Sequence, residues 1–335
     1  MIIPGLERHT AELRRIFAET KDCYRAHEIS RKVLMEIAAE PNLLGPLLRH
    51  HLSDPKNLNK LNFPSPGLFV ADSQHFYLCA NLFFGDLPQF AEGQSVTCVH
   101  HHGSLLLTTL AAFGPGCEIW TLSRPRETRL DNIFSMEPIG RQRNSLGRFA
   151  FTDAGYAHIV FPPAQLSVSL ALWSSATRRP VFDAMKSNAV LRRYKARLLA
   201  LVKLMKASSA LKLNEVVNFD FLPKESGFQA IPKRLQYPYG PNEDYLVNLF
   251  YLIQSSGNED LADVVNELLS TRLHELTNPQ SIRALLGALA RGDRINQTLS
   301  EPHQFMPGIN ITREELLRGL GRTVDQAPPI EGITR

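Results

Sequence analysis

Three consecutive histidines, His100, His101 and His102, are the densest group of metal-binding side chains in the sequence. They stand between a β-type run, Val96–Val99, and an apolar run, Leu105–Leu107, so we expect them on a strand rather than in a solvated loop or a purification remnant. Side chains alternate along a strand, which places the first and third on one face. Two imidazoles at this spacing can reach one ion, and imidazole suits iron, zinc, copper or nickel.

The surrounding segment, Glu92–Ser104, resembles the first metal motif of the cupins, and most closely that of the thiol dioxygenases typified by cysteine dioxygenase. In that family a Gly-Gln turn leads into a strand ending His-Asp-His, and His101 takes the middle place here. General cupins add a glutamate a few residues later. No glutamate follows His102 until Glu118, and the thiol dioxygenases likewise use three histidines alone.

By this resemblance the third ligand is His158. Gly155–Val160 has the glycine and histidine of the second cupin motif, and Leu166–Trp173 is similar to the last strand of the thiol dioxygenase barrel. Taken alone, a histidine on an apolar strand is more often a core residue. The resemblance implies that His100, His102 and His158 bind Fe²⁺, with Zn²⁺ or Ni²⁺ as alternatives.

The closing strand departs from the family pattern of Ser-x-His-x-Tyr. Ser169 matches the serine and is therefore a catalytic candidate, whereas Ala171 and Trp173 replace the histidine and the tyrosine. The arginine that holds the substrate carboxylate in the family has no equivalent near Gln74 and His75. We expect cupin chemistry on a small amino-acid-like or organic acid substrate, and cysteine itself is not supported.

Two further catalytic candidates share the ligand face by alternation. Tyr156 lies two residues before His158, and Cys98 lies two residues before His100. Each could contact substrate or oxygen, although packing in the core is the commoner role for both residue types.

Substrate-binding candidates come from neighbouring segments. His75 and Tyr77 alternate on the strand that leads into the site and could line the cavity, as could Trp173. Arg148 lies in a Gly/Asn/Ser-rich stretch before the second motif, where it could capture a carboxylate or simply be solvated.

The periodicity of apolar residues divides the chain into parts. Helical spacing between Gly5 and His51 predicts two helices, and short β-type runs separated by turns predict one all-β barrel between Leu68 and Ser175. Helical spacing returns after Val181. The predicted class is α+β, a cupin double-stranded β-helix barrel flanked by helices. The expected parts are an N-terminal helical segment (1–62), the barrel (63–180), a C-terminal helical domain (181–320) and a loose tail (321–335).

The composition indicates which classes of binding partner to expect. The net charge of +4 is small for 335 residues and gives no general attraction to nucleic acid. Four scattered cysteines indicate neither a disulfide framework nor a zinc knuckle. Neither a secretory signal nor a membrane-spanning run is visible, which predicts a cytoplasmic protein. We expect a small-molecule substrate and O₂ as partners, with a homodimer through the helical regions as an open expectation.

Two functional classes follow. The first is a mononuclear non-haem metal oxygenase or dioxygenase, with a zinc or nickel isomerase or hydrolase as its variant. The second is a non-catalytic, ligand-sensing cupin whose helical half binds a partner or nucleic acid. The segment Lys186–Lys212, with eight Lys or Arg and no acid, could serve such binding, but a solvated helix face is the commoner reading.

Overall fold

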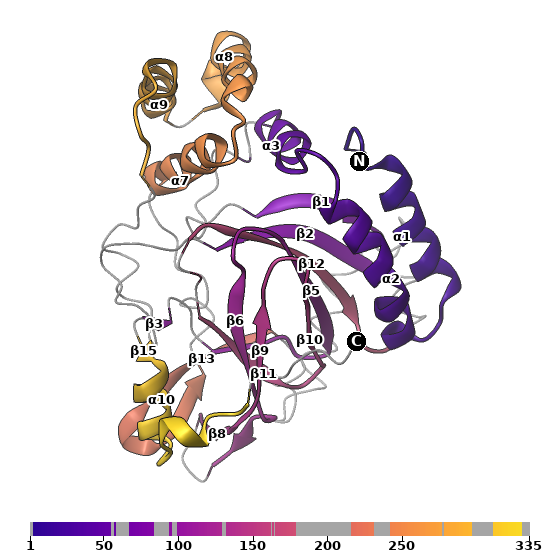
Figure 1. Ribbon diagram of the computed structural model, residues 1–335, viewed down its shortest axis with the longest axis vertical. Coiled ribbons are helices and arrows are strands. Elements are labelled where there is room, and N and C mark those ends of the chain that lie inside the picture. Colours follow the sequence, from indigo (N-terminus) through magenta and orange to yellow (C-terminus); the bar gives the residue numbers. More distant parts are fainter. Residues whose placement is uncertain are drawn as a thin grey trace, which may run out of the picture.

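The chain folds as a mixed α/β protein in a computed structural model, with antiparallel strands in two curled sheets and helices outside them (Figure 1). The predicted α+β class is confirmed at this level. The structure describes residues 3–54, 57, 67–83, 94–95, 99–128, 132–161, 163, 165–178, 216–230, 242–276, 278–296 and 311–329.

The smaller of the two curled sheets has five strands in the order β1-β2-β12-β5-β10, all antiparallel. Its central strand, β12, pairs along most of its length with both β2 and β5. The strands are β1 (Leu68–Asp72), β2 (Phe76–Phe83), β12 (Ser167–Ser175), β5 (Leu105–Phe113) and β10 (Phe149–Thr152).

The larger sheet has eight strands in the order β7-β8-β14-β13-β4-β11-β6-β9. They are β7 (Arg126–Glu127), β8 (Ile133–Ser135), β14 (Gly227–Ala230), β13 (Val217–Leu222), β4 (Val99–His101), β11 (Ala157–Phe161), β6 (Cys117–Leu122) and β9 (Pro138–Asn144). A short separate pair joins β3 (Gln94–Ser95) to β15 (Ile311–Thr312).

Side chains from the two sheets meet between them. The amide of Asn144, on β9, donates to Thr109 Oγ1 at 3.3 Å and to Ser169 Oγ at 3.4 Å, both on the smaller sheet. At the other end, the rings of His102 and Trp173 lie 4.3 Å apart between centroids. The sheets therefore enclose a common interior, with a polar bridge at one end and a histidine-bearing end at the other.

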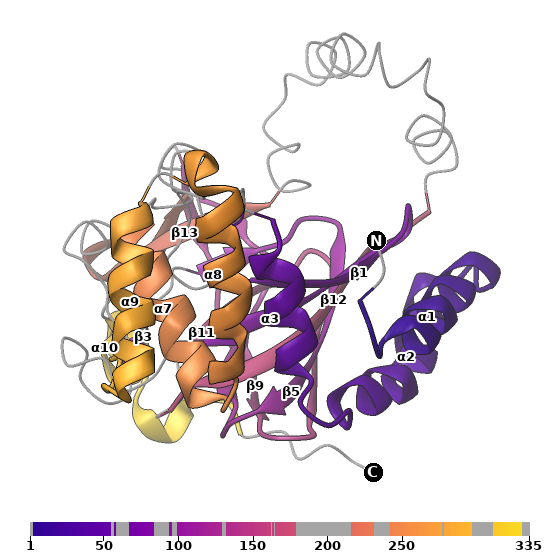
Figure 2. The same ribbon diagram turned by 90° about the horizontal axis from the view of Figure 1, so that it is seen from above.

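Helices cover the outer face of the smaller sheet. The N-terminal helices are α1 (Glu7–Glu19), α2 (Cys23–Ala38) and α3 (Leu44–Leu52). Figures 1 and 2 show α1 and α2 beside this sheet. Leu13 and Leu34 from these helices share one apolar core with Leu78 and Leu170 of the sheet. The sequence predicted only two helices here. The third follows Pro41 and includes Pro46 in its first turn, where a proline breaks no hydrogen bond.

The apolar spacing after Val181 predicts helices around 183–210, 243–255, 259–275, 279–290 and 312–320, and the described residues contain helices near the last four. They are α7 (Asn242–Ser255), α8 (Ala262–Thr271), α9 (Pro279–Arg291) and α10 (Arg313–Gly319). Figure 2 shows α7, α8 and α9 beside α3. None of the helices in the described ranges is long and apolar enough to cross a bilayer. The expected helix at 183–210 and the basic segment lie outside the described residues.

One prediction for the C-terminal half needs correction. The stretch after residue 181 was expected to be helical, but β13 and β14 belong to it and join the larger sheet through β4. The physical reason is the alternation of Val217, Phe219 and Phe221 with polar residues, which buries one face of a short strand. Strands β7, β8, β9 and β15 were also missed. The strands β1, β2, β5, β6, β10, β11 and β12 lie at the β-type runs of the sequence, at 68–71, 75–84, 105–110, 118–122, 148–151, 158–161 and 166–173.

His27 ties α2 to the smaller sheet and predicts acid sensitivity. Its ring nitrogens lie 2.7 Å from Thr108 Oγ1 and 2.9 Å from Ser174 Oγ, and burial lowers its pKa to about 4. The folded protein holds His27 neutral, and this contributes fully to the free energy of unfolding above pH 6.5. As the pH drops from there toward 4, the free energy of unfolding should fall by up to about 3 kcal/mol. Urea unfolding between pH 7 and pH 4 should show this loss, and His27→Gln should flatten the pH dependence. An equally steep pH profile in the variant would contradict the assignment.

Candidate metal centre

Three neighbouring strands bring the central residues together. In the larger sheet β4 lies between β11 and β13, and His100 stands directly opposite His158 on one side and Asn218 on the other. Residues directly opposite in an antiparallel pair have their Cβ atoms about 4.5–5.5 Å apart on the same face. Pairing of distant segments therefore sets two imidazoles and one amide in a row.

The three predicted ligands form a compact group of rings. The centroid of His102 lies 4.5 Å from that of His158 and 6.2 Å from that of His100, and the His100 and His158 centroids are 5.6 Å apart. The Nδ1 atoms of His102 and His158 are buried and have no hydrogen-bond partner among the described residues. A buried polar atom without a hydrogen bond lowers the stability of the fold by about 1–3 kcal/mol. We therefore expect these two nitrogens to have a binding partner.

Asn218 fixes the protonation of His100. Its side-chain oxygen lies 2.9 Å from His100 Nδ1, and because an amide oxygen only accepts, Nδ1 must carry the proton. The lone pair of the neutral ring is then on Nε2. Proteins usually orient a metal-binding imidazole in this way, through a hydrogen bond from the ring nitrogen that does not bind the metal. Sequence reasoning missed Asn218, although the alternation in Val217–Phe221 carries the signal for its strand.

The electrostatics keep all three rings neutral. Burial lowers the pKa of His158 to about 3, with the neighbouring imidazoles adding to the effect. Burial also lowers the pKa of His100 and, more strongly, of His102. Neutral imidazole is the form that binds metals, so near pH 7 no proton competes for the ring nitrogens.

His101 lies on the opposite face, as alternation predicted. Its ring is buried, accepts a hydrogen bond from the Gly103 backbone N–H at Nδ1 (3.3 Å) and packs edge-on against Phe219. Phe219 belongs to the apolar cluster on the outer side of the larger sheet. His101 therefore stabilises the sheet and is not part of the candidate centre.

Three imidazoles are suitable ligands for a divalent ion, but the present positions of the rings are not those of histidines that share one ion. Imidazoles that share one ion at about 2.0–2.1 Å have ring centres about 5 Å apart, and here His100 stands farther from His102 than that. As the side chains lie, no group of three or more His, Cys, Asp or Glu in the described ranges is set to hold a metal ion. The unpaired nitrogens and the fixed His100 tautomer fit such an ion, provided that the His100 ring turns inward.

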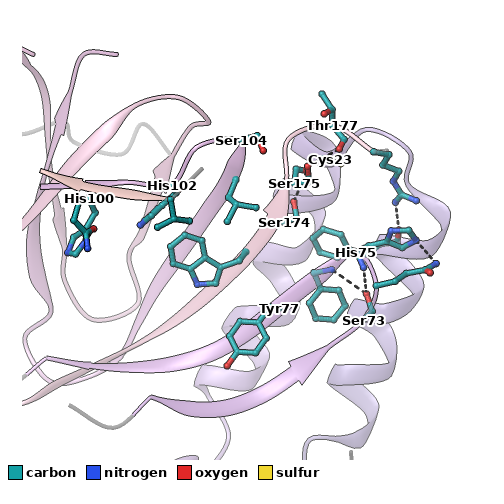
Figure 3. Close-up of a pocket in the computed structure, with 18 residues that line it drawn as sticks. Cys23, Ser73, His75, Tyr77, His100, His102, Ser104, Ser174, Ser175 and Thr177 are labelled. Atoms are coloured by element: carbon teal, nitrogen blue, oxygen red, sulfur yellow. Dashed lines mark hydrogen bonds between the residues drawn. The ribbon is translucent and has the colours of Figure 1, made fainter. Parts of the chain in front are cut away.

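A cavity of about 710 Å³ opens at this end of the sheets (Figure 3). Its lining includes His100, His102 and Asn218 at one end, and aromatic side chains beyond them. Among the predicted substrate-binding residues, His75, Tyr77 and Trp173 line it. The planes of the Trp173 indole and the His102 ring meet edge to face, at an interplanar angle of 73°.

Other candidates lie elsewhere. Ser169 is buried on β12 and accepts a hydrogen bond from Asn144, which is a structural contact. Tyr156 lies under the Arg124 guanidinium, with the carbon at the centre of that group 5.0 Å from the ring centroid, and Arg148 is exposed. None of these three lines the cavity. Cys98 lies outside the described residues.

Two residues in or near the cavity, Cys79 and Arg178, were not predicted from sequence. Cys79, whose side chain contributes to the small interior cluster with Trp173, is buried, and burial raises its pKa to about 12, so it stays a thiol. Burial likewise raises the pKa of Tyr77 to about 12, so its hydroxyl keeps its proton as a hydrogen-bond donor. Arg178, just beyond β12, also lines the cavity. No local motif marks it, because only the turn after β12 brings it there.

Comparison with known proteins finds partial similarity to solved structures only. No protein-family model matches the sequence, and no curated protein matches it. Among solved structures, part of the chain is similar to DMSP lyase DddQ from Ruegeria pomeroyi DSS-3, at 15% identity over 31% of this chain and 40% of that chain, with a TM-score of 0.22. The protein TT1209 from Thermus thermophilus aligns at 20% identity over 36% of this chain and 94% of that one, with a TM-score of 0.22.

A third similar structure is a protein with a double-stranded β-helix domain from Klebsiella pneumoniae subsp. pneumoniae MGH 78578. It aligns at 11% identity over 33% of this chain and 77% of that chain, with a TM-score of 0.21. The aligned part thus spans less than half of the lyase and about a third of this chain. At these TM-scores the alignments assign neither a family nor an activity to this chain.

Proposed function

We propose that the chain is a cupin-type, metal-dependent oxygenase or dioxygenase that binds one divalent ion through His100, His102 and His158. The observation that carries the proposal is the register of the larger sheet. It sets His158 opposite His100. The buried Nδ1 atoms of His158 and of His102, which lines the cavity, have no hydrogen-bond partner among the described residues. Core histidines without a ligand to bind would be expected to have hydrogen-bond partners for these nitrogens.

Three neutral imidazoles would leave the 2+ charge of the ion uncompensated and several positions open. Fe²⁺ is the expected ion, because an iron centre of this kind can bind an organic acid and O₂ together and pass electrons between them. Zn²⁺ or Ni²⁺ would suit the same nitrogen donors and would make the site an isomerase or hydrolase instead.

The protein's own residues have separate tasks in this proposal. Asn218 holds the proton on His100 Nδ1, so Nε2 is the nitrogen of that ring that would bind the ion. Trp173 packs against His102 and limits how far that ring can turn. Tyr77 presents a protonated hydroxyl to whatever occupies the cavity. In this proposal the substrate is an organic acid that binds in the cavity.

The test is metal binding by untagged protein. Chelator-treated protein is reconstituted anaerobically with Fe²⁺, Zn²⁺ or Ni²⁺ in separate samples, desalted and measured by elemental analysis. We expect close to one equivalent of iron per chain, and oxygen consumption when organic acids are then supplied. If no ion is retained from any sample, the ligand-sensing cupin becomes the better interpretation, and the cavity would be screened for ligands without metal.

A further inference from the structure

The cavity has a second end, away from the histidines. Figure 3 shows His100 and His102 on one side and Cys23, Ser175 and Thr177 on the other, with Tyr77 between them. The far end is built from the last residues of β12, the turn before β2 and the N-terminal helices, which contribute Phe17 and Cys23 to the lining. The cavity is therefore shared between the sheets and the N-terminal helices.

We propose that this far end binds the anionic head group, a carboxylate or a phosphate, of an elongated organic acid, and that Arg178 is the residue that recognises it. The proposal rests on the function proposed above, because it assumes that the remainder of the same molecule extends toward the histidines. It replaces the small amino-acid-like substrate expected from the sequence with a longer, amphipathic one.

Arg178 has donor capacity that the described protein atoms do not use. Its Nη2 donates to the carbonyl oxygen of Thr20 at 2.5 Å and to that of Phe17, both at the end of α1. Its Nε is buried and has no hydrogen-bond partner among the described residues. A guanidinium has five N–H donors in a planar fork that matches a carboxylate or a phosphate. The contacts to α1 engage Nη2 alone, so the group keeps donors with which it can bind an anion in the cavity that it lines.

The charge of the cavity points the same way. Arg178 is its permanently charged residue, and no aspartate or glutamate is among the described residues that line it. Its neighbours at the far end are neutral and polar, including Gln74, Ser175 and Thr177. A concave site whose described lining carries one permanent cation and no carboxylate attracts anions.

The size of the cavity indicates the length of the ligand. A volume of 710 Å³ corresponds to roughly twenty waters at about 30 Å³ each, which is far more than a small amino acid fills. Trp173 touches His102, and Arg178 follows five residues later, so the two ends are separated by up to roughly 17 Å of extended chain. The wall between them is apolar, with Phe76, Tyr77 and Leu105, and suits a hydrocarbon chain.

A purely structural role for Arg178 is the competing explanation. A cation at the carbonyl end of α1 stabilises that helix whether or not a ligand binds. The two explanations differ in one respect. Only the proposed site makes ligand affinity depend on both the ligand's charge and the arginine.

The experiment is calorimetric titration of chelator-treated full-length protein with octanoate, octyl phosphate and 1-octanol, which share one chain length. We expect at least one of the anions to bind about tenfold or more tightly than the alcohol, because hydrogen bonds to charged groups are the strong ones. In Arg178→Gln, whose amide can still donate to the α1 carbonyls, this preference should fall below about twofold. Arg148→Gln, at an exposed arginine outside the cavity, should keep it.

Equal affinity for octanol and both anions in the wild type would overturn the proposal, and so would an unchanged preference in Arg178→Gln. If Arg178→Gln does not fold, Arg178→Lys is the second variant, and it should retain a weakened, salt-sensitive anion preference. Because the titrations use metal-free protein, failure of this proposal and failure of metal binding are separate results.

Discussion

Replacing His158 with alanine is expected to abolish metal retention while the chain stays folded. The substitution removes one of three proposed donors and leaves two, so the loss should exceed the roughly 10–100-fold that removal of a hydrogen-bonding partner of a ligand costs. His158 lies opposite His100 and next to His102, so no other described imidazole is placed to substitute for it. Elemental analysis after anaerobic reconstitution with Fe²⁺ measures the effect, and far-ultraviolet circular dichroism measures the fold.

The matched control is His75→Ala. His75 lines the same cavity but lies at its other end, beside Gln74, with which it shares a 2.9 Å contact between side-chain nitrogens. This variant should retain metal like the wild type. Iron retained at wild-type levels by His158→Ala, or lost from His75→Ala, would rule out the three-histidine centre.

Replacing Glu118 with glutamine is expected to lower the free energy of unfolding by about 3–5 kcal/mol, the usual cost of breaking a buried ion pair. The Glu118 carboxylate accepts two hydrogen bonds from Arg141, at 2.9 Å each, one from Arg313 at 2.9 Å and one from the Trp120 indole at 2.5 Å. Arg313 begins α10, so this carboxylate joins the C-terminal helix to the larger sheet. In the variant two guanidinium groups would face each other without the carboxylate.

The same carboxylate predicts a pH dependence. Burial alone would raise the pKa of Glu118, but the hydrogen bonds from Arg141, Arg313 and Trp120 outweigh burial and bring the pKa down to about 2. The ionised Glu118 carboxylate therefore makes its full contribution to the free energy of unfolding above pH 4.5. As the pH falls from there toward 2, the free energy of unfolding should drop by up to about 3 kcal/mol. Urea unfolding curves at pH 7 and pH 3 should differ less in Glu118→Gln than in the wild type.

Glu137→Gln is the control for this prediction. Glu137 pairs with Arg322 at 2.9 Å, but its side chain is 71% exposed, so the pair should contribute no more than about 1 kcal/mol. A loss in Glu118→Gln as small as that in Glu137→Gln would show that the buried cluster does not hold α10 in place.

The sequence predicted the parts of the site that depend on local patterns. Alternation along one strand places His100 and His102 on one face with His101 opposite, and the structure confirms that separation. The strands with clear β-type runs and the helices with regular apolar spacing were also predictable. Their patterns follow from burial of one face, which a window of a few residues already contains.

What the sequence did not reveal depends on non-local pairing. Asn218 meets His100 across a separation of 118 residues, and nothing within the short run around Asn218 indicates which strand it will join. Arg178 enters the cavity because of a turn after β12. Arg148 and Ser169 were chosen from composition and from a family pattern, and the structure places them outside the cavity.

The position of β13 has a consequence for how the protein is made. As the chain leaves the ribosome, β4 and β11 emerge well before β13, which is the strand that pairs with the other side of β4. Until β13 arrives, β4 is an edge strand with unpaired backbone groups, and such edges invite association with other chains. His100 would also lack the amide that holds its proton in place. A nascent chain ending at β12 would therefore already carry all three histidines. It would nevertheless be prone to aggregate, and it would lack the residue that keeps the proton of His100 on Nδ1.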